Sequence, residues 1–307
     1  MFLGVHTMAN DRNDFAPEIR NTAWWASDTR QAINGKALEA VLIKQGKMPP
    51  PDLSQIEAVQ MGHVMQPVIG RLAQDKLKLE LKEADYALTH PKHDWLRSHF
   101  DFISADGKTL VEAKNYNVAV RNKFDTDTNR IPPADLAQLV HEAAVHNVDR
   151  AVLAVLFGGQ EFCTFEFVIT SEQKEELIKS MAKYWGNVQA GTQPEATTVE
   201  QTKLLYPVST ENAVMATQSI ERGITHLKYL KQQAKQIDEQ IDEMEAQVRN
   251  IMGECSEIRS IDGSVLATWR NSKPSKRFSA DLFKQAMPDI YESFVVEQPG
   301  SRRFLIK

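Results

Sequence analysis

The sequence is poor in cysteine, with only Cys163 and Cys255 among 307 residues. The two lie far apart and neither belongs to a CxxC pair, so the sequence predicts neither a disulfide framework nor a zinc site. It also lacks any apolar run of about 18 residues and any signal-peptide pattern. These absences indicate a soluble, cytoplasmic protein with no membrane partner.

The chain also lacks a strong charge of either sign, because its formal net charge is only −5. This value does not suggest a surface that is basic throughout, but it leaves room for a local basic cleft. With 42% hydrophobic residues, the chain can bury a sizeable core. We expect one large domain and an appendage.

The most informative stretch is residues 99–114, which read HFDFISADGKTLVEAK. Apolar and polar side chains alternate on both sides of Asp106 and Gly107, and Asp-Gly is typical of two-residue hairpin turns with positive φ. The stretch therefore predicts a β-hairpin in which Ala105 faces Lys108.

This register brings four polar side chains to one face of the hairpin. It places Asp101 opposite Glu112, and His99 opposite Lys114. Two carboxylates about 5 Å apart repel one another, and a hard cation such as Mg²⁺ removes that repulsion while keeping waters for a substrate. Lys114 would then orient or help to deprotonate a metal-bound water. An exposed face of mixed charge, paired by Lys114, is the alternative, and the apolar flanks favour the metal site.

Two helical patterns precede the hairpin. Ser27 or Asp28 is a good N-cap for the first, and with Arg20 nearby this helix start is either a phosphate site or an ordinary cap. The second pattern spans residues 53–79 and carries Gln66.

After the hairpin, the sequence predicts a helix over residues 134–146, which carries Gln138, and strands over 151–157 and 162–169. The continuous apolar run of 151–157 is typical of a strand buried on both faces. The order of strand, strand, helix, strand and strand predicts an α/β fold with a mixed sheet flanked by helices. The two histidines of the helix lack metal-ligand spacing, so we expect surface or capping roles for them.

The pattern changes in the C-terminal third. From Ile220 to Ile251, apolar residues recur at spacings of three and four, as in a coiled coil. Such a stripe either pairs with another helix, in this chain or another molecule, or lies on the domain's own surface. A second hairpin is predicted around Asp262-Gly263, and residues 259–307 contain nine Lys and Arg against five Asp and Glu. These basic residues suit either a DNA-facing surface or a solubilising rim.

Four blocks of residues resemble, in order and spacing, those of the lambda-type phage exonucleases. The blocks are Arg20…Ala26-Ser27-Asp28, Met61-Gly62-x-x-x-Gln66-Pro67-Val68-Ile69, Asp101…Glu112-Ala113-Lys114 and Gln138. Within the PD-(D/E)XK nucleases, the sequence looks most like the YqaJ-type viral recombinase family. The resemblance implies a restriction-endonuclease-like nuclease domain in residues 1–210 and a helical, coiled-coil-like and β-hairpin extension in 211–307.

The resemblance also assigns catalytic roles to these blocks. Asp101 and Glu112 match metal ligands, and the carbonyl of Ala113 matches a third. Lys114 matches the catalytic lysine, and Gln138 matches the active-site glutamine of the family. The implied cofactor is Mg²⁺, with Mn²⁺ as an alternative.

Two further features come from the resemblance. Arg20, Ser27 and His99 match positions that hold the 5′-phosphate of the recessed DNA strand. Gln66, in contrast, stands where the family usually has glutamate in the active site. A neutral amide still binds a metal or its water, but it removes one negative charge, which weakens a second cation more than the first.

The function implied by the resemblance is a Mg²⁺-dependent 5′→3′ exonuclease that acts on ends of linear double-stranded DNA. It would leave 3′ single strands for phage-type recombination in the cytoplasm of a bacterial host cell. The implied partner is a single-strand annealing protein, and the apolar stripe is compatible with a homo-oligomer. The alternatives are a structure-specific endonuclease or nickase of the same fold, and a weakly catalytic scaffold that binds DNA ends, which Gln66 favours.

Overall fold

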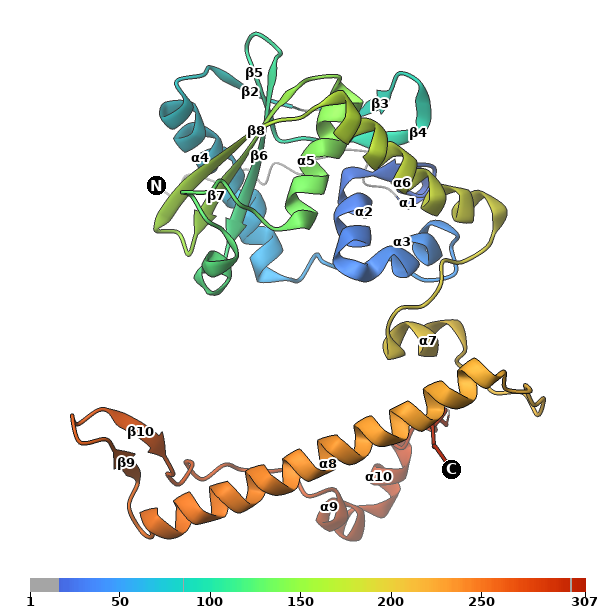
Figure 1. The fold of residues 1–307 in the computed structure, drawn as a ribbon, viewed down its shortest axis with the longest axis vertical. Helices are drawn as coiled ribbons and strands as arrows, with labels where there is room; N and C mark the ends of the chain where they lie inside the picture. Colours follow the sequence, from blue (N-terminus) through green and yellow to red (C-terminus); the bar gives the residue numbers. More distant parts are fainter. Residues whose placement is uncertain (1–16, 85, 299) are drawn as a thin grey trace. The chain divides into compact units, whose positions relative to one another are not determined.

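The computed structural model describes residues 17–84, 86–298 and 300–307. The chain divides into two compact units, the first ending at Leu205 and the second beginning at Tyr206 (Figure 1). The boundary predicted from the sequence lies a few residues later, after Thr210. None of the helices in the described part of the chain combines the length and the apolar character needed to cross a membrane.

The first unit is built on a five-stranded mixed sheet with the strand order β2-β5-β6-β7-β8. The strands are β2 (Leu81–Glu83), β5 (Phe102–Ser104), β6 (Thr109–Tyr116), β7 (Arg150–Phe157) and β8 (Glu161–Val168). β6 and β7 are parallel, and the other neighbouring pairs are antiparallel. Parallel strands need a crossover, and helix α5 (Pro133–His146) lies in the connection between β6 and β7. The predicted mixed sheet flanked by helices is confirmed.

Strand β7 divides its side chains between two apolar cores. Four of its residues join a core with α5, and three join a core with helix α4 (Glu57–Leu77). The first set is Ala151, Leu153, Val155 and Phe157, and the second is Val152, Ala154 and Leu156. Because successive side chains of a strand point to opposite faces, a continuous apolar run fills both layers. Figure 1 shows α4 and α5 on opposite faces of the sheet.

Strand β6 follows the same alternation, and this positions the polar residues of the hairpin. Leu110 belongs to the core with α5, and Val111 belongs to the core with α4. Residues two apart on a strand share a face, so Glu112 and Lys114 lie on the same side of the sheet as Leu110. The charged end of β6 therefore faces the layer that contains α5.

The hairpin of β5 and β6 has the register that the sequence predicts. Its paired residues are Phe102 with Val111 and Ile103 with Leu110. Strand β5 begins only at Phe102, so Asp101 lies just before the paired region. Continued by one residue, the same register brings Asp101 to the level of Glu112.

The turn of this hairpin differs from the predicted two-residue type. The carbonyl of Ser104 accepts a hydrogen bond from the N–H of Gly107 at 2.8 Å, and Gly107 has a positive φ of 72° whereas Asp106 does not. The Asp106 carboxylate accepts hydrogen bonds from the Ser104 hydroxyl (2.6 Å) and from the N–H of Lys108 (3.1 Å). These local bonds hold Asp106 in an ordinary backbone conformation and enlarge the loop without changing the register.

A second group of elements in the first unit surrounds the small sheet β1-β4-β3. The elements are α1 (Pro17–Arg20), β1 (Trp24–Trp25), α2 (Ala26–Gln31), the π-helical η2 (Ala32–Lys36), α3 (Ala37–Lys44), β3 (Leu88–His90), β4 (His93–Ser98), α6 (Ser171–Ala190) and α7 (Val199–Leu205). The short 3-10 helix η3 (Val118–Lys123) instead packs against the main sheet, where Arg121 binds Glu161 of β8. Buried Trp24 and Leu96 of this sheet pack with Met181 and Trp185 of α6. This core fixes the start of α2 beside the main sheet.

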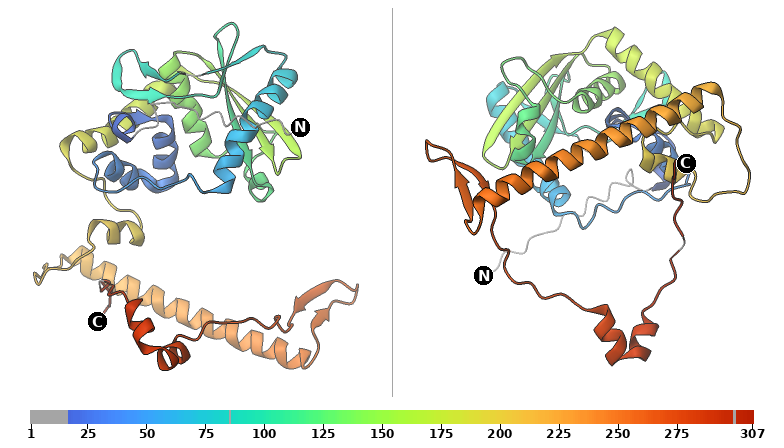
Figure 2. Two further views of the ribbon diagram at one scale, coloured as in Figure 1. Left: turned by 180° about the vertical axis from the view of Figure 1, so that it is seen from behind. Right: turned by 60° about the horizontal axis from the view of Figure 1, so that its bottom comes forward.

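The second unit contains the predicted long helix and the predicted second hairpin. Its elements are α8 (Gln218–Met252), β9 (Glu257–Arg259), β10 (Val265–Thr268), α9 (Ala280–Ala286) and α10 (Pro288–Ser293). Strands β9 and β10 pair antiparallel after the C-terminal end of α8 (Figure 2). Gly263, at the predicted turn, has a positive φ of 88°.

The packing of α4 on β5 leads to a stability prediction. A Cβ atom at Gly70 would lie 2.4 Å from Cζ of the buried Phe102 ring, whereas a Cβ at Gly62 on the same helix would meet no atom within 4 Å. We expect Gly70→Ala to lower the free energy of unfolding by about 1–3 kcal/mol through overpacking. The matched control, Gly62→Ala, should raise it by about 0.5–1 kcal/mol because alanine favours helix. Thermal or denaturant unfolding measures both, and a neutral Gly70→Ala would contradict this packing.

Candidate active site

The candidate site is centred on Glu112, a buried carboxylate in the middle of β6. Its Oε1 accepts a hydrogen bond from Lys114 Nζ at 2.5 Å and another from Gln138 Nε2 at 2.6 Å. Lys114 lies two residues along the same strand, and Gln138 comes from α5, which covers this face of the sheet. The site therefore forms where the polar end of β6 meets α5.

Asp101 approaches Glu112 from the start of β5. One of its oxygens, Oδ2, accepts a hydrogen bond from the N–H of Ala113 at 2.8 Å, which fixes the carboxyl group beside β6. Burial and the negative charge of Glu112 raise the pKa of Asp101 to about 8, although Lys114 and the Ala113 N–H oppose the rise. The two carboxyl groups lie within hydrogen-bonding reach of each other, as the sequence register predicts.

Lys114 supplies the positive charge between these carboxylates. Burial alone would lower the pKa of its ammonium group, but the charges of Glu112 and Asp101 outweigh burial and raise that pKa. Lys114 is therefore protonated in this arrangement. It acts as a cation and hydrogen-bond donor.

A second buried acid, Glu142, lies behind the site and was missed by sequence reasoning. It is fully buried on α5, and its Oε1 accepts a hydrogen bond from Gln138 Nε2 at 2.8 Å. The same Gln138 nitrogen thus bridges Glu142 and Glu112. Burial and the charge of Glu112 raise the pKa of Glu142 well above its ordinary value, so this acid is held neutral. The spacing of four residues between Gln138 and Glu142, which places both side chains on one face of the helix, is the signal that could have revealed it.

The residues present fit a divalent cation. Without a metal, burial and the neighbouring charge of Glu112 disfavour the ionised form of Asp101 and raise its pKa. Carboxylate oxygens are the ligands that Mg²⁺ prefers, and Mg²⁺ commonly takes only one or two of them and retains waters. No cluster of three or more candidate side-chain ligands occurs in the described part of the chain. Asp101 and Glu112 would thus hold the ion together with backbone oxygen, water or substrate.

Gln66 occupies a different layer from these groups. It lies on α4, one turn before the Gly70 that contacts Phe102, and α4 covers the face of the sheet opposite Glu112. Within the described residues, no hydrogen bond joins Gln66 to Asp101 or to Glu112. The structure therefore brings together Asp101, Glu112, Lys114 and Gln138, but leaves Gln66 outside this hydrogen-bonded group.

The predicted phosphate-site residues form a second cluster at the start of α2. Arg20 Nη2 donates a hydrogen bond to Ser27 Oγ at 2.9 Å, and the guanidinium lies 4.5 Å from the centre of the Trp25 ring. His99 stacks on the same ring, with a centroid distance of 5.9 Å and an interplanar angle of 13°. Trp25, which sequence reasoning did not select, thus contacts both Arg20 and His99.

Two expectations about this cluster were wrong. Helix α2 begins at Ala26, so neither Ser27 nor Asp28 is its N-cap; Ser27 instead accepts from Arg20, and Asp28 accepts a hydrogen bond from the N–H of Trp25 at 2.8 Å. His99 does not face Lys114 across the hairpin either, because the pairing begins only with β5. Stacking on Trp25 draws His99 into the Arg20 cluster instead.

A partly buried ion-pair network connects α2, β6 and α5 beside the carboxylates. Arg30 Nε donates to Asp135 Oδ1 at 2.7 Å, and Arg30 Nη2 donates to the Tyr116 hydroxyl at 2.9 Å. The Tyr116 hydroxyl donates to the same Asp135 oxygen at 2.9 Å. Burial and the charge of Asp135 raise the pKa of Tyr116 to about 12, so the phenol keeps its proton. Tyr116 lies two residues after Lys114, so this network forms one wall of the site.

His141 is fully buried, which corrects the expectation of a surface or capping role. Its Nε2 lies 2.9 Å from the carbonyl oxygen of Arg97, and its Nδ1 lies 2.7 Å from the hydroxyl of Thr29. Burial lowers the pKa of His141 to about 4, so the ring is neutral. Because a carbonyl only accepts, Nε2 carries the proton and Thr29 donates to Nδ1. Thr29 in turn accepts from the Trp24 indole at 3.1 Å, which ties α5 to α2.

Comparison with known proteins shows similarity along nearly the whole chain to one curated protein. No protein-family model matches the sequence. The sequence is 25% identical over 306 residues to the uncharacterized protein YqaJ of Bacillus subtilis, which covers 92% of this chain and 93% of YqaJ. The resemblance to YqaJ that the four blocks of residues predict is therefore confirmed.

Solved structures with similarity to this chain include two exonucleases. An alkaline exonuclease (LHK-Exo) from Laribacter hongkongensis matches at 12% identity with a TM-score of 0.48, covering 57% of this chain and 91% of that chain. A phage related exonuclease from Haemophilus somnus matches at 13% identity with a TM-score of 0.40, covering 53% and 82%.

The buried acid behind the site leads to a prediction of pH-dependent stability. The pKa of Glu142 in the folded chain lies above its ordinary 4.5, so the folded state binds more protons than the unfolded state above that pH. Its contribution to stability is present at low pH and is lost as pH rises. We expect Glu142→Gln, which keeps the acceptor for Gln138, to raise the melting temperature near neutral pH and to change it little near pH 4.5.

The matched control for Glu142→Gln is Glu175→Gln, at an exposed position on α6. Melting temperatures of both variants and the wild type would be measured against pH, with a chelator present throughout. The same pH profile for Glu142→Gln and the wild type would show that Glu142 is not held neutral.

Proposed function

We propose that this relative of YqaJ is a divalent-metal-dependent deoxyribonuclease that degrades linear double-stranded DNA from its ends. The observation that carries the proposal is the buried pair of carboxyl groups, Asp101 and Glu112, with Lys114 hydrogen-bonded to one of them. When two carboxylates lie this close together, a hard cation that both of them bind removes their mutual repulsion. The cation we propose is Mg²⁺, with Mn²⁺ as an alternative.

Each residue of the site has a task in this proposal. Asp101 and Glu112 would hold the cation, which supplies Lewis-acid polarisation of a phosphate and an activated water when bound. Lys114 would donate to the phosphate or the attacking water and balance the negative charge, as its raised pKa suits. Gln138 orients Glu112 through the 2.6 Å hydrogen bond.

The second cluster suits a terminal phosphate. Arg20 carries a permanent positive charge, the Ser27 hydroxyl lies 2.9 Å from its guanidinium, and the stacked rings of Trp25 and His99 give the cluster a flat wall. A terminal phosphate carries nearly two charges at neutral pH, whereas an internal diester carries one. The cluster would therefore favour a 5′-phosphorylated end and orient hydrolysis in the 5′→3′ direction.

The wider role that we propose comes from the resemblance to the YqaJ-type family. Digestion in the 5′→3′ direction leaves a 3′ single strand, which is the substrate of a single-strand annealing protein in phage-type recombination. A structure-specific nickase of the same fold would cut closed circular DNA. A scaffold that only binds ends would cut neither form, and the neutral Gln66, at a position where the family usually has glutamate, is the feature that favours it.

The first test is hydrolysis of end-labelled linear DNA and of closed circular DNA with added Mg²⁺. We expect the linear substrate to be degraded and the circle to survive. Asp101→Asn and Glu112→Gln, which keep the size of each side chain, should each lower the rate by at least about a hundredfold by removing a metal ligand. Both should keep or raise the melting temperature in chelator, since carboxylate repulsion is removed.

These outcomes separate the candidate functions. Activity of either variant within about tenfold of the wild type would refute the metal site. Rapid cutting of the circle by the wild type would point to the nickase, and end binding without hydrolysis would point to the scaffold.

The second test compares duplexes that differ only in their 5′ ends. The wild type should digest 5′-phosphorylated DNA about tenfold faster than 5′-hydroxyl DNA, since a charge-assisted contact to phosphate is lost with the hydroxyl. Arg20→Ala should lose most of this ratio. The ratio within each protein controls for any general loss of activity. Equal wild-type rates on the two ends would remove Arg20 and Ser27 from the proposed pocket.

A further inference from the structure

Helix α8 lacks the internal packing that normally stabilises a long helix. It spans 35 residues, and its only buried residue in the described chain is Met252 at the C-terminal end. Helices in proteins gain most of their stability from burying an apolar face. A partner for α8 is therefore expected.

The apolar residues of α8 form a regular heptad seam over residues 227–251. Its successive a and d positions are Leu227, Leu230, Ala234, Ile237, Ile241, Met244, Val248 and Ile251. Three central members are largely exposed, namely Ile237 (55%), Ile241 (50%) and Met244 (61%). A seam of this length, with spacings of three and four throughout, is typical of a coiled coil.

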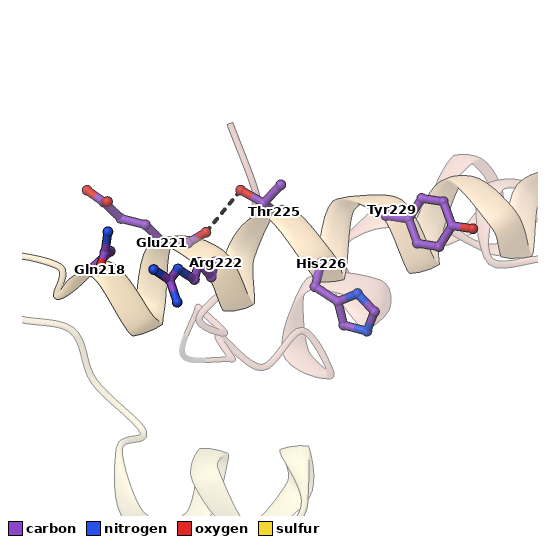
Figure 3. A pocket seen from close by; sticks show the side chains of 6 residues that line it. All are labelled: Gln218, Glu221, Arg222, Thr225, His226 and Tyr229. Carbon is purple, nitrogen blue, oxygen red and sulfur yellow. Dashed lines mark hydrogen bonds between the residues drawn. The ribbon is translucent and has the colours of Figure 1, made fainter.

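The residues of α8 outside the seam are mostly polar, with Ile220, Ile224 and Tyr229 among the exceptions. A shallow hollow on its first turns is lined by α8 alone, through Gln218, Glu221, Arg222, Thr225, His226 and Tyr229 (Figure 3). These residues occupy heptad positions other than a and d, and a hollow walled by a single helix encloses no ligand site. The partner of α8 therefore belongs on the seam.

The charges on α8 are separated along its length. Residues 218–235 contain four basic residues and one acidic residue, a net charge of +3. Residues 236–252 contain five acidic residues and one basic residue, a net charge of −4. A second copy laid parallel would bring like charges together, whereas an antiparallel copy would bring each basic half against an acidic half.

The seam also matches itself in the antiparallel direction. When the crossing point is placed at residue 239, every a position faces a d position of the other copy. The layers are Leu227 with Ile251, Leu230 with Val248, Ala234 with Met244, and Ile237 with Ile241. The small Ala234 thus faces the long Met244, which keeps the width of the seam even.

The flanking e positions favour the same arrangement. In an antiparallel pair, e positions face e positions, so Lys231 of each copy faces Glu245 of the other, and Asp238 faces its own counterpart. Two opposite-charge pairs thus outnumber one like-charge pair. In a parallel pair, g positions face e positions, so Gln233 would face Asp238 and Gln240 would face Glu245. Neither ion pair between Lys231 and Glu245 would then form.

We propose that α8 pairs antiparallel with α8 of a second copy of this chain through residues 227–251. A cleft between α8 and strand β10 lies along the C-terminal part of the seam and is lined in part by Ile241, Met244 and Val248. The N-terminal half of the partner's α8 enters this cleft. The proposal does not depend on the nuclease activity of the first unit.

The first experiment measures the mass of the full-length protein in solution by sedimentation or light scattering at micromolar concentrations. We expect a dimer, and Ile237→Asp with Ile241→Asp in one chain should convert it to a monomer with an unchanged melting transition of the first unit. A monomeric wild type would overturn the proposal, because the seam would then be covered by the chain itself or by a different protein. A dimer that survives both substitutions would overturn it as well.

The second experiment tests the direction of pairing. Lys231→Glu or Glu245→Lys alone should raise the dimer Kd by roughly tenfold, since each replaces two attractive pairs with two repulsive ones. Mixing the two variants should restore wild-type affinity in a heterodimer, because each substituted residue then faces an opposite charge. A parallel pair would show no such rescue, and its absence would overturn the proposed direction.

The matched control is Glu239→Lys. Glu239 and Glu245 each form an ion pair with a basic residue four positions away on α8, but Glu239 is at an f position, on the outside of the pair. The same charge change there should leave the Kd within about twofold of the wild type. A tenfold loss in this control would show that the effect comes from the helix itself and would overturn the assignment of Lys231 and Glu245 to the interface.

Discussion

The close approach of two buried carboxyl groups is the constraint on which the first unit depends. Asp101 and Glu112 share one side of the sheet, and the only cation hydrogen-bonded to the pair in the described structure is Lys114 on the same strand. Burial and the charge of Glu112 raise the pKa of Asp101, because the single positive charge of Lys114 does not offset them. The divalent cation that we propose would be coordinated by both carboxylates and would remove their mutual repulsion.

Helix α5 makes this arrangement possible because three of its polar side chains bind neighbouring elements while its apolar residues pack in the core. Asp135 binds the half-buried Arg30, while Gln138 binds Glu112 and His141 binds Thr29 through buried hydrogen bonds. Satisfied polar groups of this kind cost little when buried and specify one arrangement of the elements around them. Helix α5 therefore fixes both Glu112 on β6 and the start of α2, which brings the Arg20 cluster and the pair of carboxyl groups into one unit.

The second unit differs from the first in how its main helix is stabilised. Its long helix buries almost none of its apolar residues within the described chain, so a partner helix would supply the missing burial. The separation of basic and acidic residues along the helix fits the same partner. Residues such as Lys231 and Glu245 are too far apart on one helix to contact each other, but they match across two antiparallel copies. The unit thus resembles an association module attached to an enzyme-like domain.

The sequence by itself determined whatever depends on local periodicity. The alternation of apolar and polar residues around the turn predicted the β5–β6 register, and the continuous apolar run predicted that β7 is buried on both faces. The spacing of apolar residues by three and four predicted the extent of α8. The adjacency of Asp101 and Glu112 follows from the β5–β6 register. Only the tertiary structure decided what depends on contacts between distant segments: the neutral Glu142, the Arg30–Asp135–Tyr116 network, and the stacking of His99 on Trp25. Burial and partner charge are properties of the packed core, and no spacing along the chain specifies which side chains will meet there.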